Sequence, residues 1–173
     1  IAANLAQVYL LTDRPAEAIN LIGPAAANAP NSPDIQRQLG VAYQELGQIN
    51  LAEEAYGRAM DLGSSDPVVL NNRAVVLQTL GRPVEALSLL ELLKAKGDDR
   101  LETLNNLGNL YRVLGRNGQS AEIFAQALKR TPLSTSLHRN LALLKRDGGQ
   151  VTEGLAAARR AAVCDPSEID GLV

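Results

Sequence analysis

The nine residues LGVAYQELG (39–47) decide the fold, because similar stretches recur at a constant spacing of 34 residues. The four others are LAQVYLLTD (5–13), RAVVLQTLG (73–81), LGNLYRVLG (107–115) and LALLKRDGG (141–149). A small residue holds the second position in all five, and a large apolar residue holds the first in four. No insertion or deletion breaks the spacing, so one unit of structure is repeated along the chain.

Each repeat has the pattern of two helices. Leu39, Ala42 and Tyr43 follow the i, i+3, i+4 spacing that is typical of one buried helix face. Glycine follows this helix at positions 47, 81, 115 and 149, where a left-handed C-cap is needed, and Asp13 must adopt that conformation in the first repeat. Pro15 and Pro83 favour the start of a second helix, because the first turn needs no N–H there.

The spacing therefore predicts ten helices. We expect first helices over 1–12, 33–46, 67–80, 101–114 and 135–147, and second helices over 15–28, 49–62, 83–96, 117–130 and 151–164. Small residues such as Gly108 let two helix backbones approach while a large apolar side chain fills the space beside them. A single helix pair cannot bury its apolar face, so stacked pairs are expected to share a continuous core.

These features resemble the tetratricopeptide repeat (TPR) family. The match includes Leu-Gly-x-x-Tyr at 39–43 and 107–111 and the closing prolines at 30, 132 and 166. The resemblance implies an all-α fold, a right-handed superhelical solenoid of about five helix–turn–helix repeats. It predicts one array over 1–173, with repeats at 1–32, 33–66, 67–100, 101–134 and 135–168, and a further helix starting at 169–173. We expect the array to be a fragment of a longer protein.

The chain departs from the family pattern at several positions. Arg73 stands where Leu is expected, and Lys145 stands where Tyr is expected. The Trp that is usual in the first helix is replaced by Ala2, Gln36, Leu70, Leu104 and His138. His138 therefore lies in a packed column, which favours a core or boundary histidine over a ligand or a catalytic base.

A column of carboxamides precedes the Leu-Gly pair of each repeat. Its members are Asn4, Gln38, Asn72, Asn106 and Asn140. Helix formation does not explain the column, because Asn competes for backbone hydrogen bonds in mid-helix. Each amide can pair with the N–H and C=O of an extended peptide, but it can equally stabilise the stack by bonding to a neighbouring helix. The column resembles the asparagine ladder in the TPR region of O-GlcNAc-type protein glycosyltransferases, which holds acceptor polypeptide by its backbone.

Other first-helix residues are expected to share the concave groove that the resemblance implies. They make a surface that is rich in amides and mildly basic, which suits an extended polar or mildly acidic peptide. The candidate peptide-binding residues beside the column are Arg37, Asn71, Asn105, Asn109, Arg112 and Arg139, with Gln7, Gln44, Gln78 and Arg146 close by. Arg112 and Arg146 can also be read as solvated cations near the negative ends of helices. The carboxylate clamp of chaperone-binding TPR proteins is not expected, because Asp34, Val68, Glu102 and Ser136 occupy its lysine column.

Composition excludes several function classes. The net charge of −2 and an aromatic content of 3% argue against nucleic-acid binding. One Cys and one His leave no multi-cysteine metal site, and we expect no metal, no cofactor and no catalytic constellation in this segment. No apolar run is long enough to span a membrane, so membrane partners are not expected. No targeting signal is visible, which leaves only a preference for the cytoplasm.

The sequence therefore predicts a non-enzymatic interaction scaffold that binds an extended peptide or partner segment in its groove. The alternative is a substrate-recruiting TPR arm of a larger enzyme, such as a protein O-glycosyltransferase. End-to-end association of the segment is a further expectation, because Ile1, Leu5 and Val8 would be uncovered at one end.

Overall fold

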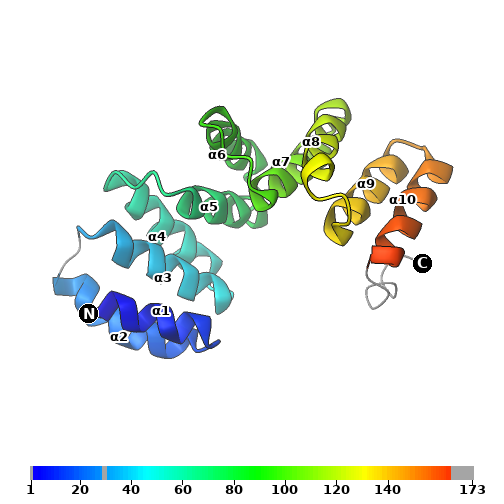
Figure 1. Cartoon of the computed structure of the whole chain (residues 1–173). Helices are drawn as coiled ribbons and strands as arrows, with labels where there is room; N and C mark the ends of the chain where they lie inside the picture. The colour runs from blue at the N-terminus through cyan, green and yellow to red at the C-terminus, as the bar shows by residue number, and fades with distance from the viewer. Residues whose placement is uncertain (1, 29–30, 165–173) are drawn as a thin grey trace. The chain divides into compact units, whose positions relative to one another are not determined.

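The structure is a computed structural model that describes residues 2–28 and 31–164. Within those two ranges the chain forms ten α-helices and no strand, in agreement with the all-α prediction (Figure 1). The first helices are α1 (Ala2–Leu11), α3 (Pro33–Glu45), α5 (Pro67–Thr79), α7 (Leu101–Val113) and α9 (Thr135–Asp147). The second helices are α2 (Pro15–Asn28), α4 (Ile49–Asp61), α6 (Pro83–Ala95), α8 (Asn117–Arg130) and α10 (Val151–Cys164). The further helix expected from residue 169 lies outside the described residues.

The predicted helix ends are confirmed by the local geometry. Asp13 has a φ of 56°, and the glycines at 47, 81, 115 and 149 have φ between 70° and 76°. Only a residue that tolerates the left-handed region can hold these positions. The helix starts use side-chain caps as well, since Asp66 Oδ1 accepts a 2.9 Å hydrogen bond from the backbone N–H of Val68.

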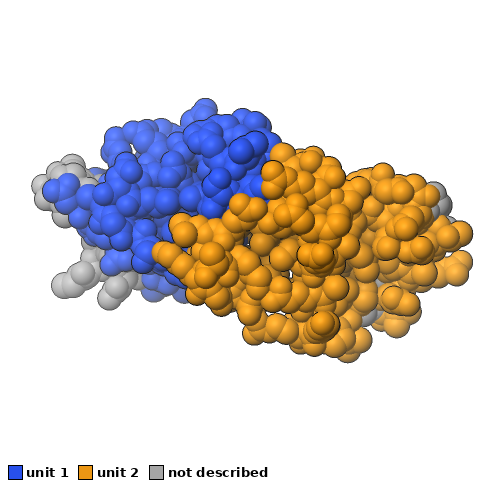
Figure 2. All heavy atoms as spheres, turned by 90° about the horizontal axis from the view of Figure 1, so that it is seen from above, with its two compact units in different colours: residues 1–89 blue, residues 90–173 orange. Residues whose placement is uncertain are grey.

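The chain divides into two compact units, Ile1–Leu89 and Leu90–Val173 (Figure 2). In the first unit, α3 packs against α1, α2, α4 and α5. In the second, α9 packs against α7, α8 and α10. The helices α3 and α9 thus each contact their own second helix and a neighbouring first helix, which is the stacking expected of a repeat array.

Two glycines show why small residues recur in the first helices. A Cβ atom at Gly40 would lie 2.5 Å from Cε1 of Tyr56, and one at Gly108 would lie 2.5 Å from Cε1 of Phe124. Both aromatic side chains are fully buried. The predicted pairing of a small residue with a large partner is therefore confirmed, and the space beside each glycine is already filled.

An ion pair explains the departure at Arg73. Arg73 NH2 lies 2.8 Å from Glu53 Oε1 on α4, and the two side chains are only 22% and 20% exposed. Arg82 NH1 approaches the same oxygen at 3.5 Å. The guanidinium of Arg73 also lies over Gly57, where a Cβ would be 3.4 Å from NH2. A charge pair between α5 and α4 thus occupies a position where the family pattern has an apolar side chain.

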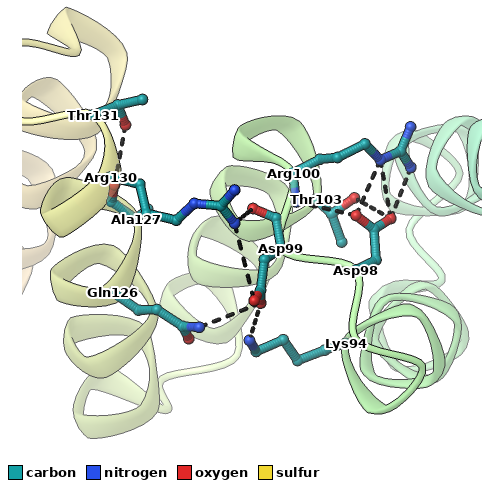
Figure 3. Close-up of polar contacts among 9 residues, drawn as sticks. All are labelled: Lys94, Asp98, Asp99, Arg100, Thr103, Gln126, Ala127, Arg130 and Thr131. Carbon is teal, nitrogen blue, oxygen red and sulfur yellow. Dashed lines mark hydrogen bonds and ion pairs between the residues drawn. The ribbon is translucent and has the colours of Figure 1, made fainter.

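Asp99 ties the α6–α7 connection to α8 in the second unit (Figure 3). Its carboxylate accepts hydrogen bonds from Lys94 and, at 3.3 Å, from Gln126 Nε2. Its backbone carbonyl accepts a 2.6 Å bond from Arg130 NH1. Because the three donors come from α6 and α8, this one residue holds the turn against two helices.

Candidate peptide-binding site

The candidate residues lie on the first helices, and we call these positions, taken in each compact unit by itself, the first-helix face. In the first compact unit it comprises the side chains of Arg37, Gln38, Asn71 and Asn72 on α3 and α5. In the second unit it comprises those of Asn105, Asn106, Asn109, Arg112, Arg139, Asn140, Arg146 and Asp147 on α7 and α9. The side chain of Asn4 lies outside the described residues.

In the first unit, Asn72 bonds within the protein. Its Nδ2 donates a 3.2 Å hydrogen bond to the hydroxyl of Tyr56, which donates in turn to Gln44 Oε1 at 3.1 Å. Burial raises the pKa of Tyr56 well above its usual value, so the phenol keeps the proton that it donates. The relay joins three successive helices, α5, α4 and α3, through one buried hydroxyl.

The neighbouring polar residues of the first unit are largely enclosed. Gln38 and Asn71 are buried, and the Oε1 atom of Gln38 has no hydrogen-bond partner among the described residues. Arg37 Nε lies 3.6 Å from Asp66 Oδ2, the carboxylate that caps α5. These contacts hold α3 and α5 together, so little of this predicted set is presented to a ligand.

In the second unit, Asn140 bonds to the preceding first helix. Its Nδ2 donates a 2.8 Å hydrogen bond to Oδ1 of Asn105, and Asn140 is only 7% exposed. Asn106 and Arg139 each interact with a neighbouring group as well. The amides of Asn72 and Asn140 therefore hydrogen-bond to neighbouring helices and stabilise the stack, which is one of the two roles that the sequence left open.

Arg112 is the centre of a polar cluster at the C-terminal ends of α7 and α9. Its Nε and NH2 donate to Asn109 Oδ1 at 3.2 and 3.1 Å, and its NH1 donates to Asp147 Oδ2 at 2.6 Å. Arg146 Nε and NH2 donate to the other oxygen, Asp147 Oδ1, at 3.2 and 3.1 Å. The hydrogen bond from Arg112 is the main cause that lowers the pKa of Asp147, which keeps this carboxylate charged at neutral pH. We call these four residues the Arg112 cluster.

The structure brings together some predicted residues and separates others. Asn109 and Arg112 meet, as do Asn105 and Asn140. Sequence reasoning did not identify Tyr56 as the partner of Asn72. The ion pair between Arg112 and Asp147 had a signal in the sequence, since the two residues stand one repeat and one residue apart on successive first helices.

His138 confirms its expected place in the core. Its side chain is buried, and its Nε2 donates a 2.8 Å hydrogen bond to the carbonyl of Pro132. It lines a pocket of about 390 Å³ with Leu133, Arg159 and Val163 among its walls. Among the described residues, no group of three or more His, Cys, Asp or Glu side chains is placed to hold a metal ion. None of the helices in the described ranges is long and apolar enough to cross a membrane.

Comparison with known families gives one consistent result. A tetratricopeptide repeat model matches residues 37–100 and 105–169, and a second tetratricopeptide repeat model matches residues 1–22. Relatives include the anaphase-promoting complex subunit CDC16 of Saccharomyces cerevisiae, with 26% identity over 82% of this chain but 18% of that protein. The uncharacterized protein y4yS of Sinorhizobium fredii is 30% identical over 78% of this chain and 69% of its own length. The chain therefore spans less than a fifth of CDC16.

Solved structures agree with the fold. YrrB, described as a TPR protein with an unusual peptide-binding site, superposes with a TM-score of 0.82 at 15% identity, covering 97% of this chain and 87% of YrrB. MamA of Desulfovibrio magneticus RS-1 gives a TM-score of 0.85 at 19% identity, covering 96% and 94% of the two chains. The predicted all-α solenoid of five helix–turn–helix repeats is thereby confirmed.

Proposed function

We propose that this chain, which belongs to the tetratricopeptide repeat family, is a protein-interaction scaffold whose first-helix face binds an extended peptide or partner segment. Two relatives support the proposal: YrrB is described as having a peptide-binding site, and CDC16 is a subunit of a multiprotein complex. The proposal assigns this segment no catalytic step and no cofactor.

The Arg112 cluster is the observation that carries the proposal. It places one carboxamide, two guanidinium groups and one carboxylate on adjacent first helices, within hydrogen-bond distance of one another. Arg146 is 66% exposed and Asp147 is 34% exposed, so a peptide has access to donors and acceptors here. Each hydrogen bond to a peptide contributes about 0.5–1.5 kcal/mol net. Several must act together, because ordering a flexible peptide opposes binding.

A peptide array tests this function. The wild-type chain and the double variant Asn109→Ala/Arg112→Ala would be probed against the same array of extended peptides. The matched control is Gln119→Ala/Lys129→Ala, which removes one carboxamide and one exposed cation from α8. We expect the first variant to lose the peptides that the wild type captures while the control retains them, with both variants folded at the assay temperature by circular dichroism. Capture that is unchanged in the first variant would refute the proposed face.

The carboxamide column favours a second candidate function. If the amides hold acceptor polypeptide by its backbone, this segment is the substrate-recruiting arm of a protein O-glycosyltransferase. The bonds of Asn72 and Asn140 inside the stack weigh against a purely ligand-facing column. The full-length protein should then transfer a sugar from a nucleotide sugar to captured peptides, and substitution of Asn4, Asn72, Asn106 and Asn140 by Ala should abolish transfer. An absence of transfer by the wild type rejects this candidate and leaves the scaffold function intact.

A further inference from the structure

We infer that the α7–α9 part of the first-helix face selects acidic segments, and that the Asp147 carboxylate competes internally with the carboxylate of the partner. The inference rests on the proposed function and adds the chemical class of the ligand and a residue that limits its affinity. It depends on the Arg112 cluster alone. In the described part of the first unit, α3 and α5 have no equivalent, because Gln44 and Gln78 occupy the corresponding positions.

The guanidinium groups of Arg112 and Arg146 keep N–H donors that the cluster itself does not use. A guanidinium carries five N–H groups. The contacts described above use three of those of Arg112 and two of those of Arg146. Within the described residues, two N–H groups of Arg112 and three of Arg146 are left for a ligand. Carboxylates suit them best, because guanidinium and carboxylate groups can form parallel, charge-assisted hydrogen bonds.

The Arg112 cluster differs in charge from the chain as a whole. Two guanidinium groups share one carboxylate, so the cluster carries an excess positive charge although the chain as a whole carries −2. The net negative charge of the protein repels an acidic peptide weakly and favours no particular site on the surface. Binding of an acidic peptide would therefore report the cluster rather than a general attraction.

Asp147 lies at a helix position that is unfavourable for a carboxylate. It is the last residue of α9, where the partial negative charge of the helix end disfavours a carboxylate. Its two oxygens instead accept hydrogen bonds from Arg112 and Arg146, and Arg112 is only 18% exposed. Asp147 thus occupies the donors that an acidic side chain of a partner would need, and its charge repels that side chain.

Fluorescence anisotropy with two defined probes tests the inference. The probes are labelled short peptides of alternating glutamate and glycine, or of alternating glutamine and glycine. We expect the glutamate peptide to bind more tightly, and Asp147→Asn to raise its affinity further by about threefold, as for a partly exposed charge pair. Arg112→Gln should lower it by about tenfold, because it removes charge-assisted hydrogen bonds. The double variant should lose the gain from Asp147→Asn.

The matched control is Glu153→Gln, which changes the net charge equally but removes a partner of Lys145 instead. It should leave the affinity unchanged, and the circular dichroism spectrum of every variant should show that it is folded at the assay temperature. Equal binding of the two probes, no gain in Asp147→Asn or an equal gain in Glu153→Gln would overturn the inference while peptide capture on the array stands. Failure of the wild type to capture any array peptide would overturn the proposed function itself.

Discussion

The side-chain nitrogen of Asn140 donates a 2.8 Å hydrogen bond to the side-chain oxygen of Asn105, so two carboxamides join successive first helices. Asn140 is buried, and Asn105 is partly so. A buried amide that loses its partner keeps its desolvation cost without the bond that offsets it. The pair gives a physical reason for a carboxamide at this position, whatever the face binds.

Substitution of Asn140 tests that reason. Asn140→Ala removes the donor and leaves Asn105 Oδ1 without it, so the free energy of unfolding should fall by about 1–2 kcal/mol. Urea unfolding followed by circular dichroism measures the change. Gln119→Ala on the exposed side of α8 is the control and should stay within about 0.5 kcal/mol of the wild type. Equal, small effects of both substitutions would mean that the amide does not stabilise the stack.

Alanine substitutions at two glycines of one repeat should change the free energy of unfolding in opposite directions. Gly108→Ala places a Cβ 2.5 Å from Phe124 and should lower the free energy of unfolding by about 1–3 kcal/mol. Gly118→Ala, near the start of α8, meets no atom within 4 Å and should raise it by about 0.5–1 kcal/mol, because alanine loses less backbone entropy. Urea unfolding of both variants measures the contrast. Stabilisation by Gly108→Ala would show that the packing beside Phe124 is loose.

The Arg73–Glu53 ion pair, which joins α5 to α4, should have a larger coupling energy than an exposed ion pair within α4. A double-mutant cycle with Arg73→Gln and Glu53→Gln should give a coupling energy of about 1 kcal/mol or more, because both side chains are mostly buried. The reference cycle uses Arg58 and Glu54, which are more than half exposed and should couple by about 0.3–0.5 kcal/mol. Unfolding free energies of the variants give both values, and equal couplings would contradict the structural role of Arg73.

Asp98 should make stability depend on pH. Its carboxylate is 9% exposed and accepts hydrogen bonds from Arg100 and Thr103 (Figure 3). These hydrogen bonds, and chiefly the one from Arg100, lower the pKa of Asp98 to about 2. Because the pKa is lower in the folded state, this contribution is complete above the unfolded value near 4 and disappears as the pH falls towards 2. The shift corresponds to about 2 kcal/mol.

The isosteric variant Asp98→Asn isolates this effect from other carboxylates. We expect it to be less stable than the wild type at pH 7 and the difference to close between pH 4 and pH 2, as measured by urea unfolding at several pH values. A difference that stays constant over that range would assign the stabilisation to shape rather than to charge.

The fold was predictable because each repeat carries its own signals. Glycine at 47, Asp13 and Pro83 mark helix ends by backbone conformation alone, which depends on neither partner nor packing. Every described helix end falls within one residue of its predicted position. The 34-residue register then requires neighbouring pairs to share a core.

The site was predictable only in part, because side-chain partners depend on angles that the repeat pattern does not contain. The column predicts where Asn72 and Asn140 stand, but not that one bonds to Tyr56 and the other to Asn105. Asn71 shows the same limit, since it is fully buried although its position suggested a groove residue. Burial arises from the stacking of helices, which a single repeat does not encode.

The most direct test of the central claim is chemical-shift mapping by nuclear magnetic resonance of the 18.4 kDa chain on addition of a captured peptide. We predict that the largest shifts fall on the first helices, with α7 and α9 foremost and the side-chain signals of Asn109 and Arg112 among them. Shifts confined to the second helices, such as α8 and α10, would contradict binding at the first-helix face.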